Sequence, residues 1–429
     1  MGNADAVCRR WRHVVFGSPR RLDLRVVCTN TTPTSRLLDI WPPFPIIVSL
    51  PPLFPELDEN GVNNLIAALE CRDRISKINI GYIRGPLLEK LVPMLHEPFP
   101  VLTTLSLWST DESVPELPET FLGGSAPRLR SFWLEGIPFP SFPKFILSFT
   151  HILHLHLVGI PGSGYISPGV MAICLAALPN LESLSIGFRS PPSRPLQSSP
   201  PHLTRVALLA LSSLAFSGVS GYFEDFVTRI DTPCLTRLSM AFFMAPIFNI
   251  PRLRNLINHT EGLKPFNRAA MWLSSPTITI GLESPARFEL EIKCGRPDWQ
   301  LSSMTQIFSQ QLPLFSYVEQ LEIRHYAWGF EWKDDPDMDS TLWLELFRLF
   351  VAAQILHVSE RLVSPIARAL QDLTGQMATE VLPVLRTLFL EGLESSGPVH
   401  EAMKPFVTAR QLSDQPVVIQ RWGRQQPGP

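Results

Sequence analysis

Apolar residues recur along this chain in the pattern L-x-x-L-x-L, in which the residues marked x are mostly polar. In residues 129–137 the apolar positions are Leu129, Phe132 and Leu134, and polar or aromatic residues lie between them. Successive side chains of a strand point to opposite faces. The pattern therefore predicts short strands that bury the leucine positions and present the residues beside them on the other face.

The pattern returns at a regular interval in the first half of the chain. Its first apolar position falls at residues 75, 102, 129, 152 and 181, so successive copies start 23 to 29 residues apart. Helices are expected before most copies, over residues 61–71, 86–96, 118–122, 142–149 and 168–178. An interval of about 20–29 residues is typical of leucine-rich repeats, whose units pack only on their neighbours.

The second half of the chain repeats the pattern less regularly. Further copies are expected over residues 211–216, 235–240, 318–323, 353–358 and 385–390, with helices over 222–230, 342–350, 362–373 and 399–411. Between residues 246 and 312 we expect two helices, 250–259 and 301–312, and two strands, 277–282 and 288–292. The predicted fold class is α/β: a leucine-rich-repeat-like solenoid over residues 21–422, with a curved parallel sheet and outer helices.

Four other segments stand apart from the repeats. Residues 189–201 are rich in Pro and Ser and predict a surface loop, with a polyproline ligand for a partner domain as the alternative. Residues 333–339 are acidic but lack the D-x-D-x-D-G loop and distal Glu of a calcium site, which favours a solvated loop. Residues 423–429 predict a flexible tail, and residues 416–420 predict a closing edge strand.

Composition excludes several classes of function. The net charge of −2 is not the basic footprint of a nucleic-acid binder, so no nucleic-acid partner is expected. No apolar run is long enough to span a bilayer, so no membrane partner is expected either. The six cysteines contain no C-x-x-C pair and are too sparse for a disulfide framework. These features favour a cytoplasmic or nuclear location.

Residues 6–16 predict an amphipathic helix that precedes the repeats. Val7, Trp11, Val14 and Val15 share one helical face, and Gly17-Ser18-Pro19 is a stop signal. A capping helix of the solenoid with a buried tryptophan is one interpretation.

The run V-C-R-R-W-R-H-V-V-F-G-S-P-R-R-L-D-L resembles the C-terminal portion of an F-box. The matching residues are Val7, Cys8, Arg9, Trp11, Pro19 and Leu22. The repeat array likewise resembles the leucine-rich-repeat-like domains of fungal F-box proteins. The resemblance implies that residues 1–20 are a remnant F-box whose opening segment would lie before Met1. It also implies contact with a Skp-type adaptor and cullin ligase through Val7, Cys8, Trp11, Val14, Val15 and Pro19.

Signals of enzymatic chemistry are scarce. The sequence has no G-x-S-x-G, no P-loop, no G-x-G-x-x-G and no H-E-x-x-H motif, so we expect no catalytic residues and no cofactor. His154 and His156 share one face of an expected strand and could form half of a zinc site. No third or fourth ligand is evident, and two exposed polar residues are the alternative, so no metal is expected.

The repeat geometry instead predicts a partner-binding face on the concave side of the sheet. Its candidate residues are Trp108, Trp133, Glu135, His154, His156, Arg237, Glu322 and Arg324. Trp108, Trp133 and the histidines fall on consecutive strands, about 4.8 Å apart. Tryptophan and arginine are enriched at binding hot spots. Coverage of this face by another loop is the alternative.

Two functions follow from these expectations. The F-box resemblance implies a non-catalytic substrate-recognition subunit of a cullin–RING, SCF-type ubiquitin ligase that binds an unknown protein substrate on the concave sheet. The alternative is a free-standing leucine-rich-repeat interaction module without ligase contact.

Overall fold

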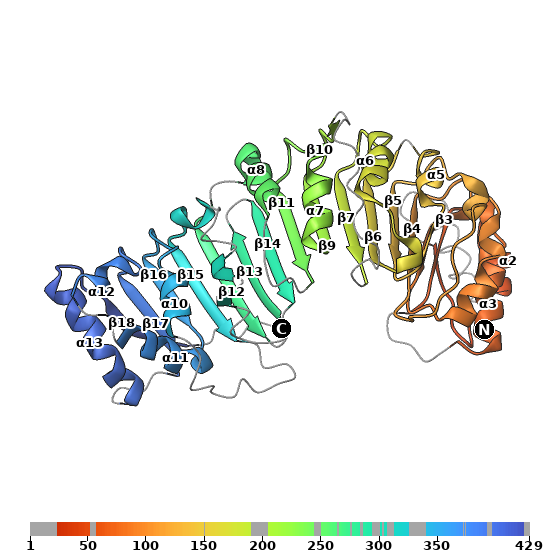
Figure 1. Ribbon diagram of the computed structural model, residues 1–429. Coiled ribbons are helices and arrows are strands. Elements are labelled where there is room, and N and C mark those ends of the chain that lie inside the picture. Colours follow the sequence, from red (N-terminus) through yellow and green to blue (C-terminus); the bar gives the residue numbers. More distant parts are fainter. Residues whose placement is uncertain are drawn as a thin grey trace, which may run out of the picture. The chain divides into compact units, whose positions relative to one another are not determined.

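The computed structural model describes residues 24–51, 57–149, 151–189, 205–243, 250–263, 266–274, 277–283, 286–293, 301–302, 304–306, 313–325, 340–371, 373, 375–392 and 397–423. The chain forms two compact units, Met1–Ala210 (unit 1) and Leu211–Pro429 (unit 2). Figure 1 shows both units as a sheet with helices packed beside it.

Unit 1 is a parallel sheet whose strands follow the order of the sequence. The strands are β1 (Leu24–Val27), β2 (Ile46–Ser49), β3 (Ile75–Ile80), β4 (Thr104–Trp108), β5 (Ser131–Glu135), β6 (His154–Ile160) and β7 (Ser183–Phe188). A short strand, β8 (Val206–Ala207), lies near the end of the unit. Each of β1–β7 pairs in parallel with the next strand of that series, as the repeat pattern predicts.

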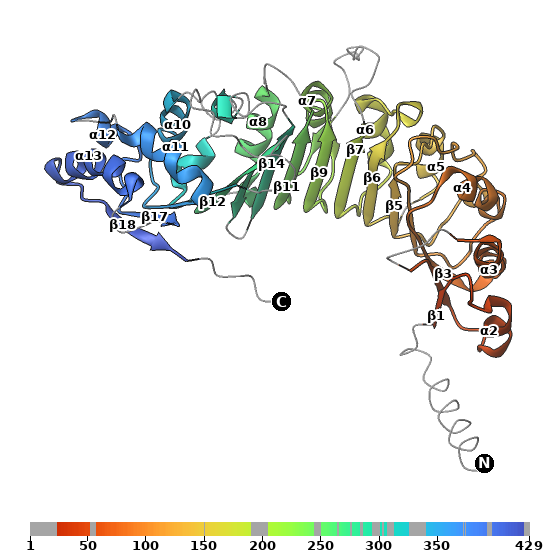
Figure 2. The same ribbon diagram turned by 90° about the horizontal axis from the view of Figure 1, so that it is seen from below.

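The helices of unit 1 lie between the strands in sequence. They are α2 (Thr34–Ile40), α3 (Glu59–Leu69), α4 (Gly85–Leu91), α5 (Phe142–Ile146) and α6 (Pro168–Ala176), with 3-10 turns η2 (Arg72–Arg74), η3 (Met94–His96), η4 (Phe121–Gly124) and η5 (Gly162–Gly164). Figure 2 shows the helices α2–α6 along one side of the strands. The other face of this sheet, called the open face of unit 1, carries no helix of the described residues.

Local residue chemistry moves several helix ends from their predicted positions. Helix α3 begins at Glu59, two residues early, because Asp58 Oδ1 accepts the Gly61 N–H at 2.9 Å and caps the first turn. The predicted helix 86–96 divides into α4 and η3 near Pro93, which has no N–H to donate. The predicted helix 142–149 ends at Ile146.

The leucine positions form the core of unit 1. Leu129, Phe132 and Leu134 are all buried, and the equivalent positions of the neighbouring strands are buried with them. A correction concerns where the strands begin. In β5 the strand starts at Ser131, because the Leu129 N–H is used in a turn and donates to the Ala126 carbonyl at 3.0 Å. The first leucine of the pattern therefore fills the core from the turn that precedes the strand.

The described residues of unit 2 form nine strands of its main sheet. They are β9 (Ser213–Gly218), β11 (Arg237–Phe242), β12 (Arg268–Ser274), β13 (Thr277–Glu283), β14 (Arg287–Lys293), β15 (Gln320–His325), β16 (Ile355–Val358), β17 (Thr387–Glu391) and β18 (Val418–Trp422), with the short β10 (Ile230–Asp231) outside that order. Their spatial order within this unit is β9-β11-β14-β13-β12-β15-β16-β17-β18.

The sheet of unit 2 departs from the predicted all-parallel arrangement. Strand β13 pairs antiparallel with both β12 and β14. Only residues 275–276 and 284–286 connect these strands in the sequence, and a parallel crossover needs about a dozen residues or more. Strand β12 itself is absent from the prediction. Its sequence Arg-Ala-Ala-Met-Trp-Leu-Ser carries apolar residues at both buried and open positions, so it shows no alternation.

The helices of unit 2 are α7 (Ser220–Val227), α8 (Pro251–His259), α10 (Ser340–Phe347), α11 (Glu360–Gln371), α12 (Met377–Glu380) and α13 (Pro398–Leu412), with 3-10 turns η6 (Glu261–Leu263) and η7 (Pro313–Tyr317). Helices α10 and α11 begin and end a few residues before the predicted spans, and α13 matches its span within one residue at each end.

Several predictions fall on residues outside the described ranges. They concern the F-box-like residues Val7, Cys8, Trp11, Val14, Val15 and Pro19, residues 190–201 of the Pro/Ser-rich loop, most of the helix 301–312, the acidic segment 333–339, and residues 424–429 of the tail.

Candidate partner-binding surface

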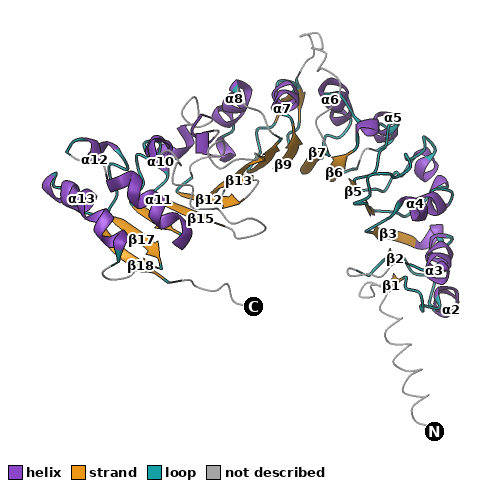
Figure 3. Cartoon of the chain, turned by 60° about the horizontal axis from the view of Figure 1, so that its bottom comes forward, coloured by secondary structure: helices purple, strands orange, loops and turns teal. Residues whose placement is uncertain are grey.

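The open face of unit 1 carries side chains in straight rows across the strands. One row runs Lys77, Thr104, Ser131, His154 and Ser183, and the next runs Asn79, Ser106, Trp133, His156 and Ser185. Residues in the same row face the same side because the strands pair in parallel and in register. The helices lie on the opposite face of each sheet (Figure 3), so these rows are the part of unit 1 best placed to meet a partner.

The centre of this face is an aromatic stack. The rings of Trp133 and His156, on neighbouring strands, lie 4.5 Å apart between centroids with their planes 19° apart. The indole Nε1 of Trp133 donates to Glu135 Oε2 at 3.4 Å. His156 Nδ1 and Ser185 Oγ form a hydrogen bond of 3.0 Å. Three of the predicted site residues, Trp133, Glu135 and His156, thus form one connected group.

The stack remains accessible although its histidine is half-buried. Trp133 keeps 39% of its surface exposed, so the described residues do not cover it. Burial lowers the pKa of His156 below its ordinary value of 6.5, and the nearby His154 lowers it further. Both effects favour the uncharged form of the ring that packs on Trp133.

His154 lies in the row beside this stack, two residues before His156 on the same strand. Among the residues that the structure describes, no group of three or more His, Cys, Asp or Glu side chains is arranged to hold a metal ion. His156 already uses one ring nitrogen on Ser185.

Trp108 lies in a third row of the open face, opposite Glu135 on the next strand. Its indole packs over the backbone of Gly81, where an added Cβ would overlap the ring. Its ring centroid is 4.3 Å from that of Tyr82. Trp108 is on the strand next to Trp133, as predicted, and its ring contacts are with Gly81 and Tyr82 on the side away from Trp133.

In unit 2 the predicted site residues fall at two separate places on the sheet face opposite the helices, called the open face of unit 2 (Figure 3). Arg237 is exposed on β11, and three strands, β14, β13 and β12, separate it from β15. Glu322 and Arg324 lie together on β15, where the Arg324 Nε contacts the Glu322 carboxylate. The sequence prediction placed all three residues on one sheet face and gave no indication of how far Arg237 lies from the other two.

Arg324 also belongs to an aromatic group that the sequence prediction omitted. Its guanidinium carbon lies 5.5 Å from the ring centroid of Trp422. His357 stacks on Phe389 with centroids 4.5 Å apart and planes 5° apart, and it lies 5.0 Å from Trp422. Alternation around residues 355–358 and 387–391 could have placed His357 and Phe389 on this face. Trp422 lies beyond the predicted edge strand 416–420, because β18 runs from Val418 to Trp422.

No protein-family model and no curated protein matches the sequence. Among solved structures, the chain is similar to the leucine-rich repeat-containing protein LegL7 from Legionella pneumophila, at 10% sequence identity and a TM-score of 0.29, over 92% of this chain and 99% of that one. The strand registers and the buried apolar positions define the fold.

Those registers define two α/β units built from leucine-rich-repeat-like strands and helices. Repeat arrays of this class present extended surfaces for binding other proteins. No helix in the described ranges is long and apolar enough to cross a membrane.

Proposed function

We propose that this chain is a non-catalytic protein-recognition module that binds its partner on the open face of unit 1. The observation that carries this proposal is the exposed Trp133, stacked on His156 in the middle of the rows. A large aromatic side chain held rigidly on a surface contributes contact area at low entropic cost. The surrounding Ser, Thr and Asn side chains supply hydrogen-bonding groups around that anchor.

We propose further that the recognised protein is a substrate of a cullin–RING, SCF-type ubiquitin ligase. The support is the resemblance of residues 7–22 to the end of an F-box. In this proposal Val7, Cys8, Trp11, Val14, Val15 and Pro19 contact a Skp-type adaptor, and the sheet holds the substrate. The chain positions the substrate and catalyses no bond chemistry, and it acts in the cytoplasm or nucleus.

A free-standing interaction module is the second candidate. In this candidate function the chain binds its partner on the open face of unit 1 and does not bind the adaptor. No protein-family model matches the sequence, so the F-box interpretation depends on residues 7–22. This observation favours the free-standing module.

Two substitutions separate recognition of a partner from contact with the ligase. The tagged wild type is incubated with purified Skp-type adaptor, in parallel with Trp11→Ala and Trp133→Ala. The substrate-receptor proposal expects the wild type and Trp133→Ala to retain the adaptor and Trp11→Ala to lose it. Retention of adaptor by none of the three chains supports the free-standing module. Equal retention by all three contradicts the role given to Trp11.

The recognition step is tested with the same chains in a cell extract, by quantitative mass spectrometry of the captured proteins. Proteins held by the wild type and by Trp11→Ala but lost from Trp133→Ala are the expected partners. If every protein captured by the wild type is captured equally by Trp133→Ala, the open face of unit 1 is not the binding surface.

A further inference from the structure

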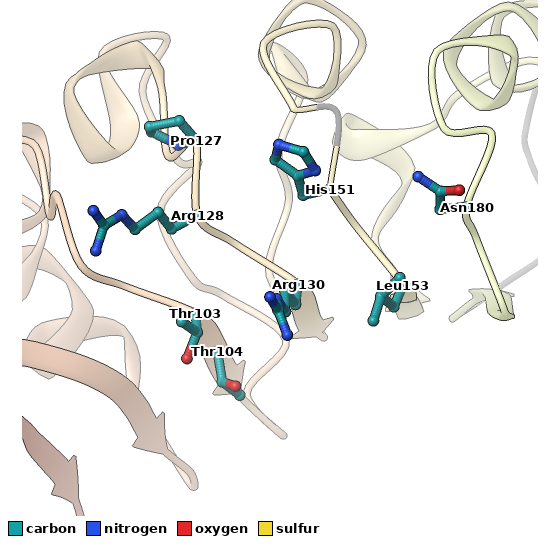
Figure 4. A pocket seen from close by; sticks show the side chains of 8 residues that line it. All are labelled: Thr103, Thr104, Pro127, Arg128, Arg130, His151, Leu153 and Asn180. Atoms are coloured by element: carbon teal, nitrogen blue, oxygen red, sulfur yellow. The ribbon is translucent and has the colours of Figure 1, made fainter.

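A groove of about 860 Å³ crosses the edge of unit 1 where strands β4–β7 begin, beside the open face. It is lined by Thr103, Thr104, Pro127, Arg128, Arg130, His151, Leu153 and Asn180. Figure 4 shows these residues on the turns and strand starts of successive repeats. Its size falls within the range of about 300–1,000 Å³ that is typical of ligand pockets.

A rigid ladder of backbone hydrogen bonds forms one side of this groove. The Thr103 carbonyl accepts the N–H groups of Arg130 and Ser131 at 2.8 and 3.1 Å. The Arg130 carbonyl accepts those of Leu153 and His154 at 2.8 and 3.0 Å. Thr103, Arg130 and Leu153 therefore occupy the same position on three successive repeats, which fixes the spacing of their side chains.

The groove carries positive charge that is not compensated locally. Arg128 and Arg130 are exposed and form no ion pair within the described residues. In contrast, Arg72 pairs with Glu97 and Lys144 with Glu119 in the same unit.

The lining of the groove holds no carboxylate that would oppose this positive charge. None of the eight lining residues is acidic, and His151 adds a third basic side chain. The Glu182 N–H donates to the Leu153 carbonyl and so continues the ladder on the next repeat. Glu182 is not among the residues that line the groove. The groove therefore offers two guanidinium groups to an anionic ligand.

We propose that this groove binds an extended acidic segment of a protein partner, with Arg128 and Arg130 paired to its carboxylates. A guanidinium group matches a carboxylate with two parallel hydrogen bonds. Thr104 and Asn180 offer hydroxyl and amide groups to the backbone of the segment, and Pro127 and Leu153 offer apolar contact.

The lining favours a peptide over a nucleic acid. The described residues that line the groove include no Trp, Tyr or Phe, the side chains with the largest faces for stacking a base, and stacking is the common basis of single-strand binding. Nucleic-acid affinity grows with the number of Lys and Arg side chains that contact phosphates, and only two arginines are among the described residues lining this groove. This site goes beyond the open-face site, and it can be present whether or not Trp133 binds a partner.

Fluorescence anisotropy with the full chain tests the proposal directly. The probes are a fluorescein-labelled ten-residue peptide of Glu and Ser, the same peptide with Gln in place of Glu, and labelled dT10. The test variant is Arg128→Gln/Arg130→Gln. The matched control is Arg36→Gln/Lys90→Gln, which removes the same charge from exposed residues of unit 1 outside the groove.

The expected result is binding of the Glu peptide by the wild type and by the control variant. In Arg128→Gln/Arg130→Gln we expect the Kd to rise about tenfold or more, since a lost charge-assisted hydrogen bond of about 1.5–3 kcal/mol corresponds to at least that factor. Circular dichroism of the variant should match the wild type, because both arginines are exposed.

Three results would overturn the proposal. Equal affinity for the Glu and Gln peptides would exclude recognition by charge. An equal loss in the control variant would assign binding to the overall charge of the chain. Tighter binding of dT10, lost in Arg128→Gln/Arg130→Gln, would assign the groove to a nucleic acid.

Discussion

The indole of Trp133 lies nearly flat against the imidazole of His156, at a centroid distance of 4.5 Å and an interplanar angle of 19°. The two residues are register partners on β5 and β6, so their contact is fixed by the backbone pairing of the strands. The hydrogen bond between His156 and Ser185 extends this group to β7. The aromatic pair thus spans two strands of the open face of unit 1, and its hydrogen bond reaches a third.

Removal of this anchor should cost little stability. Trp133→Ala loses a stacked pair worth about 0.5–1.5 kcal/mol beyond area burial, and the side chain is 39% exposed. We expect the free energy of unfolding, measured by urea denaturation, to fall by about 1–2 kcal/mol. The matched core variant Phe132→Ala should lose about 3–5 kcal/mol, because Phe132 is fully buried. Similar losses in both variants would show that Trp133 is a core residue.

Acidification should destabilise the protein partly through His156. Burial and then His154 lower the pKa of His156 in the folded state below 6.5. As the pH falls below about 6.5, the unfolded chain binds a proton that the folded chain does not, so stability decreases until the pH reaches the folded pKa. We expect His156→Asn to reduce the slope of unfolding free energy against pH in this window.

The pH experiment needs a control because other histidines contribute. Burial also lowers the pKa of His325 and His357 in unit 2. The exposed His151, replaced by Asn in the same unit as His156, serves as the matched variant. Identical slopes for His156→Asn and the wild type between pH 5 and 7.5 would contradict the assignment.

Gly81 should tolerate no side chain, since Trp108 occupies the space. An added Cβ would overlap the indole, and filling a packed site costs about 1–3 kcal/mol. We expect Gly81→Ala to lower the unfolding free energy by that amount, and Gly81→Ala/Trp108→Ser to lose less than the two single changes added together. Gly162, with open space around its Cα, is the control, and Gly162→Ala should change stability by less than about 0.5 kcal/mol.

Arg410 should be important for the stability of unit 2 although no acidic side chain of the described residues pairs with it. It is fully buried and donates to the carbonyls of Ala378, Pro383 and Leu385 at 3.1–3.3 Å. Arg410→Met leaves these acceptors without that donor, for which we expect a loss of about 2–4 kcal/mol in urea denaturation. The exposed Arg368→Met should stay within about 0.5 kcal/mol of the wild type.

The sequence predicts those parts of the fold that depend on spacing. The leucine pattern gives most strands of both units and the outward rows that contain Trp133, Glu135 and His156. It fails for β12, where Ala270 and Trp272 make the open face as apolar as the buried one. Alternation does predict the strands over 277–282 and 288–292, which are β13 and β14. It does not predict that β13 runs antiparallel to its neighbours, which follows from the short connections on either side of it.

Contacts between distant repeats cannot be predicted from the pattern. The position of Trp108 depends on the missing side chain of Gly81, and the register between the two strands decides whether they meet. Likewise, Arg128 and Asn180 lie 52 residues apart in the sequence and line one groove only because the turns of successive repeats stack. In both cases the side-chain direction and the strand register determine which residues meet, and the leucine pattern specifies neither.

Site-specific photo-cross-linking tests the central claim that the open face of unit 1 binds a protein. Benzoylphenylalanine is placed in cells at Ser131, in the row beside Trp133, or at Ile173, which is 52% exposed on helix α6. The account predicts a discrete cross-linked protein from position 131 that disappears when Trp133→Ala is added, and none from position 173. A cross-link from position 173 alone, or one from position 131 that persists in Trp133→Ala, would contradict it.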